Sequence, residues 1–317
     1  MISQSIYANT LAEYEAKNLL SREKLRRIAG TGFGDAVKIL IEYGYFGDYP
    51  SSSLSPDVDG FITAQIRELT AFVEENCPCA ALTKALLNRF VYSDAKALFK
   101  ARCAGFDVSG ALYLENDTLR DAFANQKYAS LPPFLQNAVS ALGEKPSAKE
   151  IDRVFTNAMF QDNLASAAEV GASFVRYCKR EIDIANILSA YRAEKMNFNA
   201  GELLAELFEG GEISSEDFAA ISGAGFAALS RALKGTVYEE AAFLLESGNI
   251  PGFRKHTSEL LFGTLKNEYT DFTGFGPFIR YFISRLSEIQ NVNFILICSK
   301  NNIAFDLNDL WSPADDF

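Results

Sequence analysis

The sequence predicts an all-α fold, and three observations support that prediction. Apolar residues recur at steps of three and four over long stretches, which is the period of a helix face. Helix start signals stand between these stretches, among them Gly276-Pro277 and the capping box Ser147-x-x-Glu150. Alternation of apolar and polar residues is rare, and the single strand-like run, Val292 to Cys298, is equally able to finish a helix.

The N-terminal third is predicted to hold four helices separated by turn-forming residues. On the first helix, Ile6, Thr10 and Tyr14 share one side. The next three helices are expected at residues 35–43, 61–76 and 80–103. Glycine, serine and proline residues fill the stretch 44–60, and Pro78 separates the last two helices.

The middle and last thirds repeat this plan. Prolines at 132, 133 and 146 interrupt the helices, and the capping box at Ser147 is expected to open one long helix that reaches Arg180. At 1.5 Å per residue, about thirty residues would span roughly 45 Å, which is long enough for a strut. Further helices are predicted at residues 183–195, 201–208, from Ser215 onward, at 253–269 and from Gly276 to the end of the apolar run.

A short pattern occurs three times along the chain. Asn9-x4-Tyr14-x-Ala16-Lys17 recurs as Asp94-x4-Phe99-x-Ala101-Arg102 and as Asn186-x4-Tyr191-x-Ala193-Glu194. The copies predict three similar helical modules, at residues 1–89, 90–180 and 181–317, the last of which includes the closing helix. Aromatic residues at helical spacing beside leucines are typical of a core, which is the interpretation we favour for Tyr14, Phe99 and Tyr191. The alternative is a symmetric aromatic collar around an inserted shaft.

The closing segment, GPFIRYFISRLSEIQNVNFILICSK, carries two lines of side chains on one helix. The first is an apolar stripe, formed by Phe278, Phe282, Leu286, Ile289 and Val292. Beside it, Tyr281, Arg285 and Glu288 form a second line at steps of four and three. These three residues are candidates for a partner interface. The alternative is an ordinary intrahelical ion pair next to a packed tyrosine.

This segment resembles the C-terminal signature of one family of rotary-motor proteins, the C subunits of the A/V-type (vacuolar-type) ATPases and ATP synthases, which are related to the d subunit of eukaryotic V-ATPases. The signature has the form P-x-x-x-Y-x-x-x-K/R-x-x-E-x-x-x-V/I-R, which Pro277, Tyr281, Arg285 and Glu288 match. Asn293 stands where the family usually has an arginine. The N-terminal stretch TLAEYEAKNLLSREKLRRI extends the resemblance over most of the chain.

The resemblance implies three modules in a pseudo-threefold, funnel-like arrangement. It implies a non-catalytic central-stalk (rotor) subunit that links the central axle to the membrane proteolipid ring on the cytoplasmic face. Such a subunit transmits torque for ATP-coupled proton or sodium ion transport and needs no nucleotide, metal or cofactor of its own. The alternative function is a helical-repeat adaptor unrelated to rotary motors.

Composition excludes several other classes. The net charge of -11 over 317 residues argues against nucleic acid and anionic lipid as partners, and is compatible with a basic protein. No apolar run approaches the roughly 18 to 20 residues of a spanning helix. The first ten residues lack the pattern of a signal peptide, and five scattered cysteines do not suggest a disulfide framework. We therefore expect a cytoplasmic protein.

Three short motifs suggest chemistry but have simpler interpretations. Gly30-Thr31-Gly32-Phe33-Gly34 lacks the preceding strand of a dinucleotide site, so we expect a loop between helices. Cys77-Pro78-Cys79 supplies only two of the four ligands of a structural zinc site. His256, the only histidine, is expected at the surface near a helix start. No constellation with catalytic spacing is present, which predicts a non-enzyme.

Overall fold

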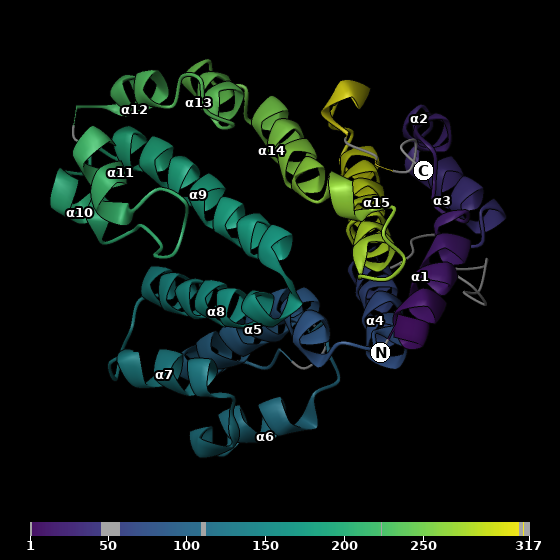
Figure 1. The fold of residues 1–317 in the computed structure, drawn as a ribbon, viewed down its shortest axis with the longest axis horizontal. Helices are drawn as coiled ribbons and strands as arrows, with labels where there is room; N and C mark the ends of the chain where they lie inside the picture. The colour runs from purple at the N-terminus through teal and green to yellow at the C-terminus, as the bar shows by residue number, and fades with distance from the viewer. Residues whose placement is uncertain (1, 46–57, 109–111, 223, 311–312, 314–317) are drawn as a thin grey trace. The chain divides into compact units, whose positions relative to one another are not determined.

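The structure is a computed structural model that describes residues 2–45, 58–108, 112–222, 224–310 and 313. Within these ranges every regular element is a helix, as predicted (Figure 1). The chain divides into two compact units, of which the first combines residues 1–78 with 267–317 and the second holds residues 79–266. Most of the predicted turn-rich stretch 44–60 lies outside the described residues.

The first unit is built around the helix nearest the C-terminus. Its helices are α1 (Ile2–Ala16), α2 (Arg22–Ala29), α3 (Phe33–Glu42), α4 (Val58–Asn76) and α15 (Gly276–Lys300). Helix α15 contacts all four of the others, and its most extensive contacts are with α1 and α4 (Figure 1). The glycine-rich motif at 30–34 joins α2 to α3, so the prediction of a loop between helices is confirmed.

Helix α15 is buried on most sides because it is apolar on most sides. The predicted stripe is buried, and so are Ile279, Ile295 and Leu296. The helix begins at the predicted Gly276-Pro277, and the run from Val292 to Cys298 continues it. Gly276 is required by close packing, since a Cβ there would lie 1.7 Å from the Glu268 carbonyl oxygen.

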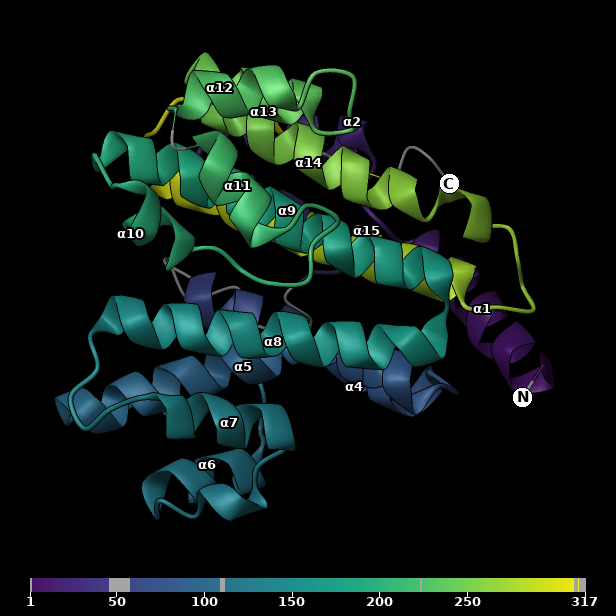
Figure 2. The same ribbon diagram turned by 60° about the vertical axis from the view of Figure 1, so that its left-hand side comes forward.

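Two apolar cores lie among the described residues of the second unit. Its helices are α5 (Ala80–Ala104), α6 (Asp117–Ala124), α7 (Pro133–Ala141), α8 (Ala148–Val170), α9 (Ala172–Lys195), α10 (Ala200–Leu204), α11 (Ser215–Ser222), α12 (Phe226–Ala232), α13 (Glu239–Glu246) and α14 (Ile250–Thr264). One core lies among α5 to α8, which run side by side in Figure 2. The other lies among α9 to α14.

The predicted long helix from Ser147 to Arg180 is wrong. Ser147 does cap its start, since its hydroxyl accepts a hydrogen bond from the Glu150 N–H. However, α8 ends at Val170, because Gly171 has φ 150° and breaks the helix before α9 begins. Two smaller differences from the prediction are that α10 ends at Leu204, before the predicted 208, and that Ser214 rather than Ser215 accepts the capping hydrogen bond of α11.

The first polar position of the repeat has the same role in all three copies. Asn9, Asp94 and Asn186 are each almost fully buried. The Asn9 side chain donates to the carbonyls of Phe272 and Gly274 and accepts from the Phe278 N–H. Asp94 accepts from two backbone N–H groups of a connecting segment, and Asn186 exchanges two hydrogen bonds with the Phe208 backbone. Each copy therefore fixes a connecting segment or helix start.

The aromatic position of the repeat differs between the copies. Phe99 is buried in the α5–α8 core and Tyr191 is partly buried against the second core, as predicted. The core interpretation is wrong for Tyr14, whose residue surface is 63% exposed. Helix α1 packs through small residues such as Ala8 and Ala12, which turns its larger side chains outward.

The division into modules at 89/90 and 180/181 and their pseudo-threefold arrangement stay predictions. Helices α5 and α9 run through these two positions, and α15 packs within the first unit.

Candidate functional site

The second line of α15 lies at the centre of a polar cluster in the first unit. Tyr281, Arg285 and Glu288 come from successive turns of α15. They face Gln65 and Glu68 of α4 and Tyr45, which follows the end of α3. The structure therefore brings the three predicted residues together with side chains from two other segments.

The Arg285 guanidinium is held on both of its terminal nitrogens. Nη1 donates to the Tyr45 hydroxyl at 2.6 Å and to the Glu288 carboxylate. Nη2 donates to the Gln65 side-chain oxygen and lies 3.8 Å from the Glu68 carboxylate. Only 16% of the Arg285 side chain is exposed, so these partners replace most of its water.

Glu288 is the buried counter-charge of Arg285. Its carboxylate also accepts hydrogen bonds from the Leu20 N–H and the Tyr45 hydroxyl. Burial, reinforced by the Glu288 charge, raises the pKa of Tyr45 well above its ordinary value, so that tyrosine stays a hydrogen-bond donor. Removing one member of the buried Arg285–Glu288 pair would leave the other charge buried without its partner, which is strongly destabilising. The pair is therefore a fixed structural feature of α15.

Tyr281 is packed against aromatic rings. Its ring centroid lies 5.0 Å from that of Phe72 in an edge-on arrangement, and Phe72 stacks on Phe278 at 5.6 Å. Burial raises the pKa of Tyr281 to about 12, so its hydroxyl is neutral at physiological pH.

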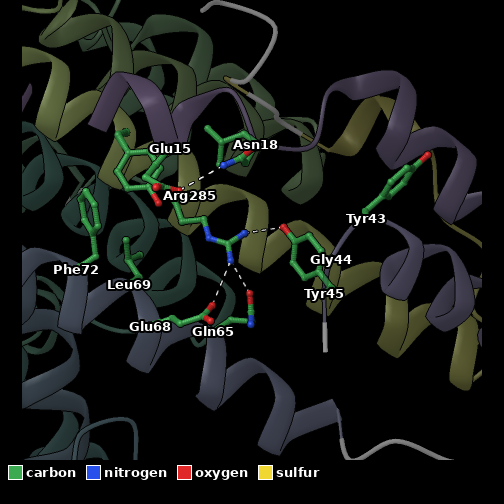
Figure 3. A pocket seen from close by; sticks show the side chains of 12 residues that line it. Glu15, Asn18, Tyr43, Gly44, Tyr45, Gln65, Glu68, Leu69, Phe72 and Arg285 are labelled. Carbon is green, nitrogen blue, oxygen red and sulfur yellow. Dashed lines mark hydrogen bonds and ion pairs between the residues drawn. The ribbon is translucent and has the colours of Figure 1, made fainter. Parts of the chain in front are cut away.

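A cavity of about 360 Å³ opens beside this cluster (Figure 3). Its lining comes from α1, α4, α15 and the end of α3: Glu15, Asn18, Leu19, Tyr43, Gly44, Tyr45, Gln65, Glu68, Leu69, Phe72, Tyr281 and Arg285. In Figure 3 the Arg285 guanidinium points between Tyr45 on one side and Gln65 and Glu68 on the other. The volume of the cavity is in the range of small-ligand pockets, roughly 300 to 1,000 Å³.

The intrahelical alternative for the predicted site is confirmed in one respect, since Arg285 and Glu288 form an i,i+3 ion pair. Tyr281 and Glu288 are both more than nine-tenths buried within the chain. A contact between these residues and a partner stays a prediction, and the cavity is the route by which a partner would reach Arg285 and Tyr281.

Sequence reasoning missed Tyr45, Gln65, Glu15 and Glu68. Gln65 and Glu68 are spaced by three on a predicted helix, which shows that they share a face but not which helix they meet. Tyr45 is 243 positions from Glu288, and no local pattern links the two.

The other sequence motifs do not form a second site. Cys77 and Cys79 are partly buried on either side of Pro78, and His256 is partly buried within α14 rather than at the surface. Among the described residues, no three His, Cys, Asp or Glu side chains are arranged to hold a metal ion. Across the same ranges, every helix falls short of the length or apolar character needed to cross a membrane.

Comparison with known protein families shows a match over nearly the whole chain. Residues 8–307 match the family model described as ATP synthase (C/AC39) subunit. The match covers both compact units and the polar cluster on α15. No curated protein matches the sequence.

Proposed function

Because the chain belongs to the ATP synthase (C/AC39) subunit family and is a subunit of a V/A-type rotary ATPase, we propose that it is the non-catalytic rotor component of the central stalk. In this role it links the central axle to the membrane proteolipid ring and transmits torque for ATP-coupled proton or sodium ion transport. It is held at the cytoplasmic face of the membrane by its protein partners. The family match over residues 8–307 carries this proposal and leaves no support for an unrelated adaptor.

The packing of the chain is suited to a mechanical role. Buried polar side chains fix helix starts and connecting segments at Asn9, Asp94 and Asn186, so these segments resist displacement. Helix α15 has 25 residues, which at 1.5 Å per residue is a rod of roughly 37 Å. Such a body passes a load between two partners without chemistry of its own.

The test is association of the purified chain with two partners, a central-axle subcomplex and a detergent-solubilised proteolipid ring. We expect binding to both, and neither binding nor hydrolysis of ATP, since no phosphate-binding loop is present in the sequence. The net charge of -11 predicts that added salt slows association more than it speeds dissociation. ATP turnover that persists through repurification would contradict the non-catalytic role. Failure of the folded chain to bind either partner at low salt would contradict the rotor role.

A further inference from the structure

We propose that the cavity beside Arg285 receives a lysine or arginine side chain of a partner protein. The inference rests on the proposed function, because it names the kind of side chain by which an axle protein would be held. Four features of the cavity support it: an excess of negative charge at the rim, a hydroxyl without a hydrogen bond to any described residue, aromatic walls, and exposed tyrosines on the adjoining helix.

The charges that line the cavity do not balance. The positive charge of Arg285 is matched by Glu288, which lies behind the cavity wall. Glu15 and Glu68 then remain at the rim. Glu15 accepts only from the Asn18 amide at 3.4 Å among the described residues, and Glu68 is 71% exposed and 3.8 Å from Arg285. Glu68 therefore shares Arg285 with Glu288, and Glu15 has no cationic partner among the described residues, so a second cation at the rim would be attracted by both carboxylates.

Tyr281 contributes a hydroxyl-bearing side chain to the lining of the cavity. The residue is 8% exposed and lines the cavity, and no described residue forms a hydrogen bond with its hydroxyl. The hydroxyl lies within electrostatic range of Arg285 and of three carboxylates, Glu15, Glu288 and Glu68, of which Glu15 and Glu68 are at the rim. The hydroxyl faces the cavity, where an ammonium or guanidinium N–H could donate a hydrogen bond to it.

The walls suit the stem and the charge of a long basic side chain. Phe72 presents aromatic surface, against which cations are attracted electrostatically. The rings of Tyr43 and Tyr45 also line the cavity, and each already has a cation of this chain over it. Leu19 and Leu69 supply apolar contact for a methylene stem. A compact inorganic cation would use the carboxylates but not these walls.

A protein is favoured over a small amine because of what adjoins the rim. Tyr14, which precedes Glu15 on α1, is 63% exposed, and Tyr7, two turns earlier on the same side, is 67% exposed. Exposed tyrosines in such a row are typical of protein interfaces, where the ring is covered and the hydroxyl stays wet. The cavity would then hold the basic anchor and the α1 tyrosines the surrounding contact.

The first experiment tests the cavity without any axle protein. The full chain is labelled with 3-fluorotyrosine, the Tyr281 ¹⁹F signal is assigned with Tyr281→Phe, and the amides of acetyl-arginine, acetyl-lysine and acetyl-norleucine are titrated. We expect a saturable shift of the Tyr281 signal with a basic probe and none with norleucine. Glu15→Gln/Glu68→Gln should weaken that binding at least tenfold. The matched control is Glu169→Gln/Glu246→Gln, which removes two exposed carboxylates of the second unit and should leave it unchanged.

Three outcomes of this titration would overturn the proposal. They are no saturable shift with either basic probe in a folded protein, equal weakening in both double variants, and a response to Ca²⁺ alone, which would assign a metal ion instead. The second experiment repeats the variants with the axle subcomplex, where the pocket variant should bind at least tenfold more weakly than the control. If the unmodified chain, the pocket variant Glu15→Gln/Glu68→Gln and the control variant bind the axle equally well, the pocket is not the anchor, although the rotor role stands. Binding of the basic probe without axle binding would refute the rotor role while the pocket stands.

Discussion

Replacement of Glu288 should destabilise α15 far more than a surface change. Glu288→Leu removes the buried counter-charge of Arg285, whose side chain is only 16% exposed. Breaking one side of a buried pair costs about 3 to 5 kcal/mol. The double variant Glu288→Leu/Arg285→Leu removes both charges and should recover most of that loss, since apolar replacement of a whole buried pair is often close to neutral.

Hydrogen exchange is the suitable assay, because a chain of two units need not unfold in one step. At 1.4 kcal/mol per factor of ten, the loss corresponds to exchange of the protected α15 amides that is faster by roughly two to nearly four powers of ten. Peptides from α8, in the other unit, serve as the internal control. If Glu288→Leu speeds α15 exchange less than about fivefold, or the double variant exchanges as fast as Glu288→Leu, the buried pair does not stabilise this helix as argued.

Three further predictions concern the packing of the chain. Phe99→Ala, in the α5–α8 core, should lower the free energy of unfolding of that unit by about 3 to 5 kcal/mol in denaturant titrations. Burial raises the pKa of Glu181 despite the nearby Arg89 charge. The contribution of Glu181 to stability is therefore fully present below the ordinary glutamate pKa near 4 and is lost as the pH rises toward neutrality. Glu181→Gln should flatten the pH profile of stability above pH 4. Asn293→Leu should raise stability by about 1 kcal/mol, because the buried Asn293 Oδ1 has no hydrogen-bond partner among the described residues.

Each of these has a matched comparison. Tyr14→Ala removes the aromatic ring from the exposed copy of the same repeat position and should change stability by less than about 0.5 kcal/mol, so equal losses at 14 and 99 would contradict the packing described. A Glu181→Gln profile that runs parallel to that of the wild-type chain would contradict the assigned pKa direction. A less stable Asn293→Leu variant would show that the asparagine oxygen has a partner in solution.

The parts of the fold that depend on neighbouring residues could be predicted from the sequence. The start of α15 at Pro277, the cap at Ser147 and the ion pair of Arg285 with Glu288 each involve residues within four positions of one another. The resemblance centred on Pro277 also pointed to the family that the comparison over residues 8–307 shows.

The remaining features depend on contacts across the chain or on a single backbone angle. The break at Gly171 needs one residue at φ 150°, and the apolar pattern continues on either side of it. The exposure of Tyr14 follows from α1 packing through its alanines, which no spacing rule distinguishes from packing through tyrosine and isoleucine. The cavity could not be predicted, because Tyr45 and Gln65 reach Arg285 across 240 and 220 positions.

The discontinuous first unit has a consequence for the order of events during synthesis. Helices α1 to α4 are translated long before the helix they pack against, because α15 spans residues 276–300. Residues 79–266 form a compact unit of their own, which is free to fold while translation continues. The apolar face of the N-terminal helices is uncovered during this time. The Asn9 side chain also lacks its hydrogen bond to the Gly274 carbonyl, which lies 265 positions later in the chain. A nascent chain of this design is therefore most exposed to aggregation and to chaperone binding along α1 to α4, until α15 has been made.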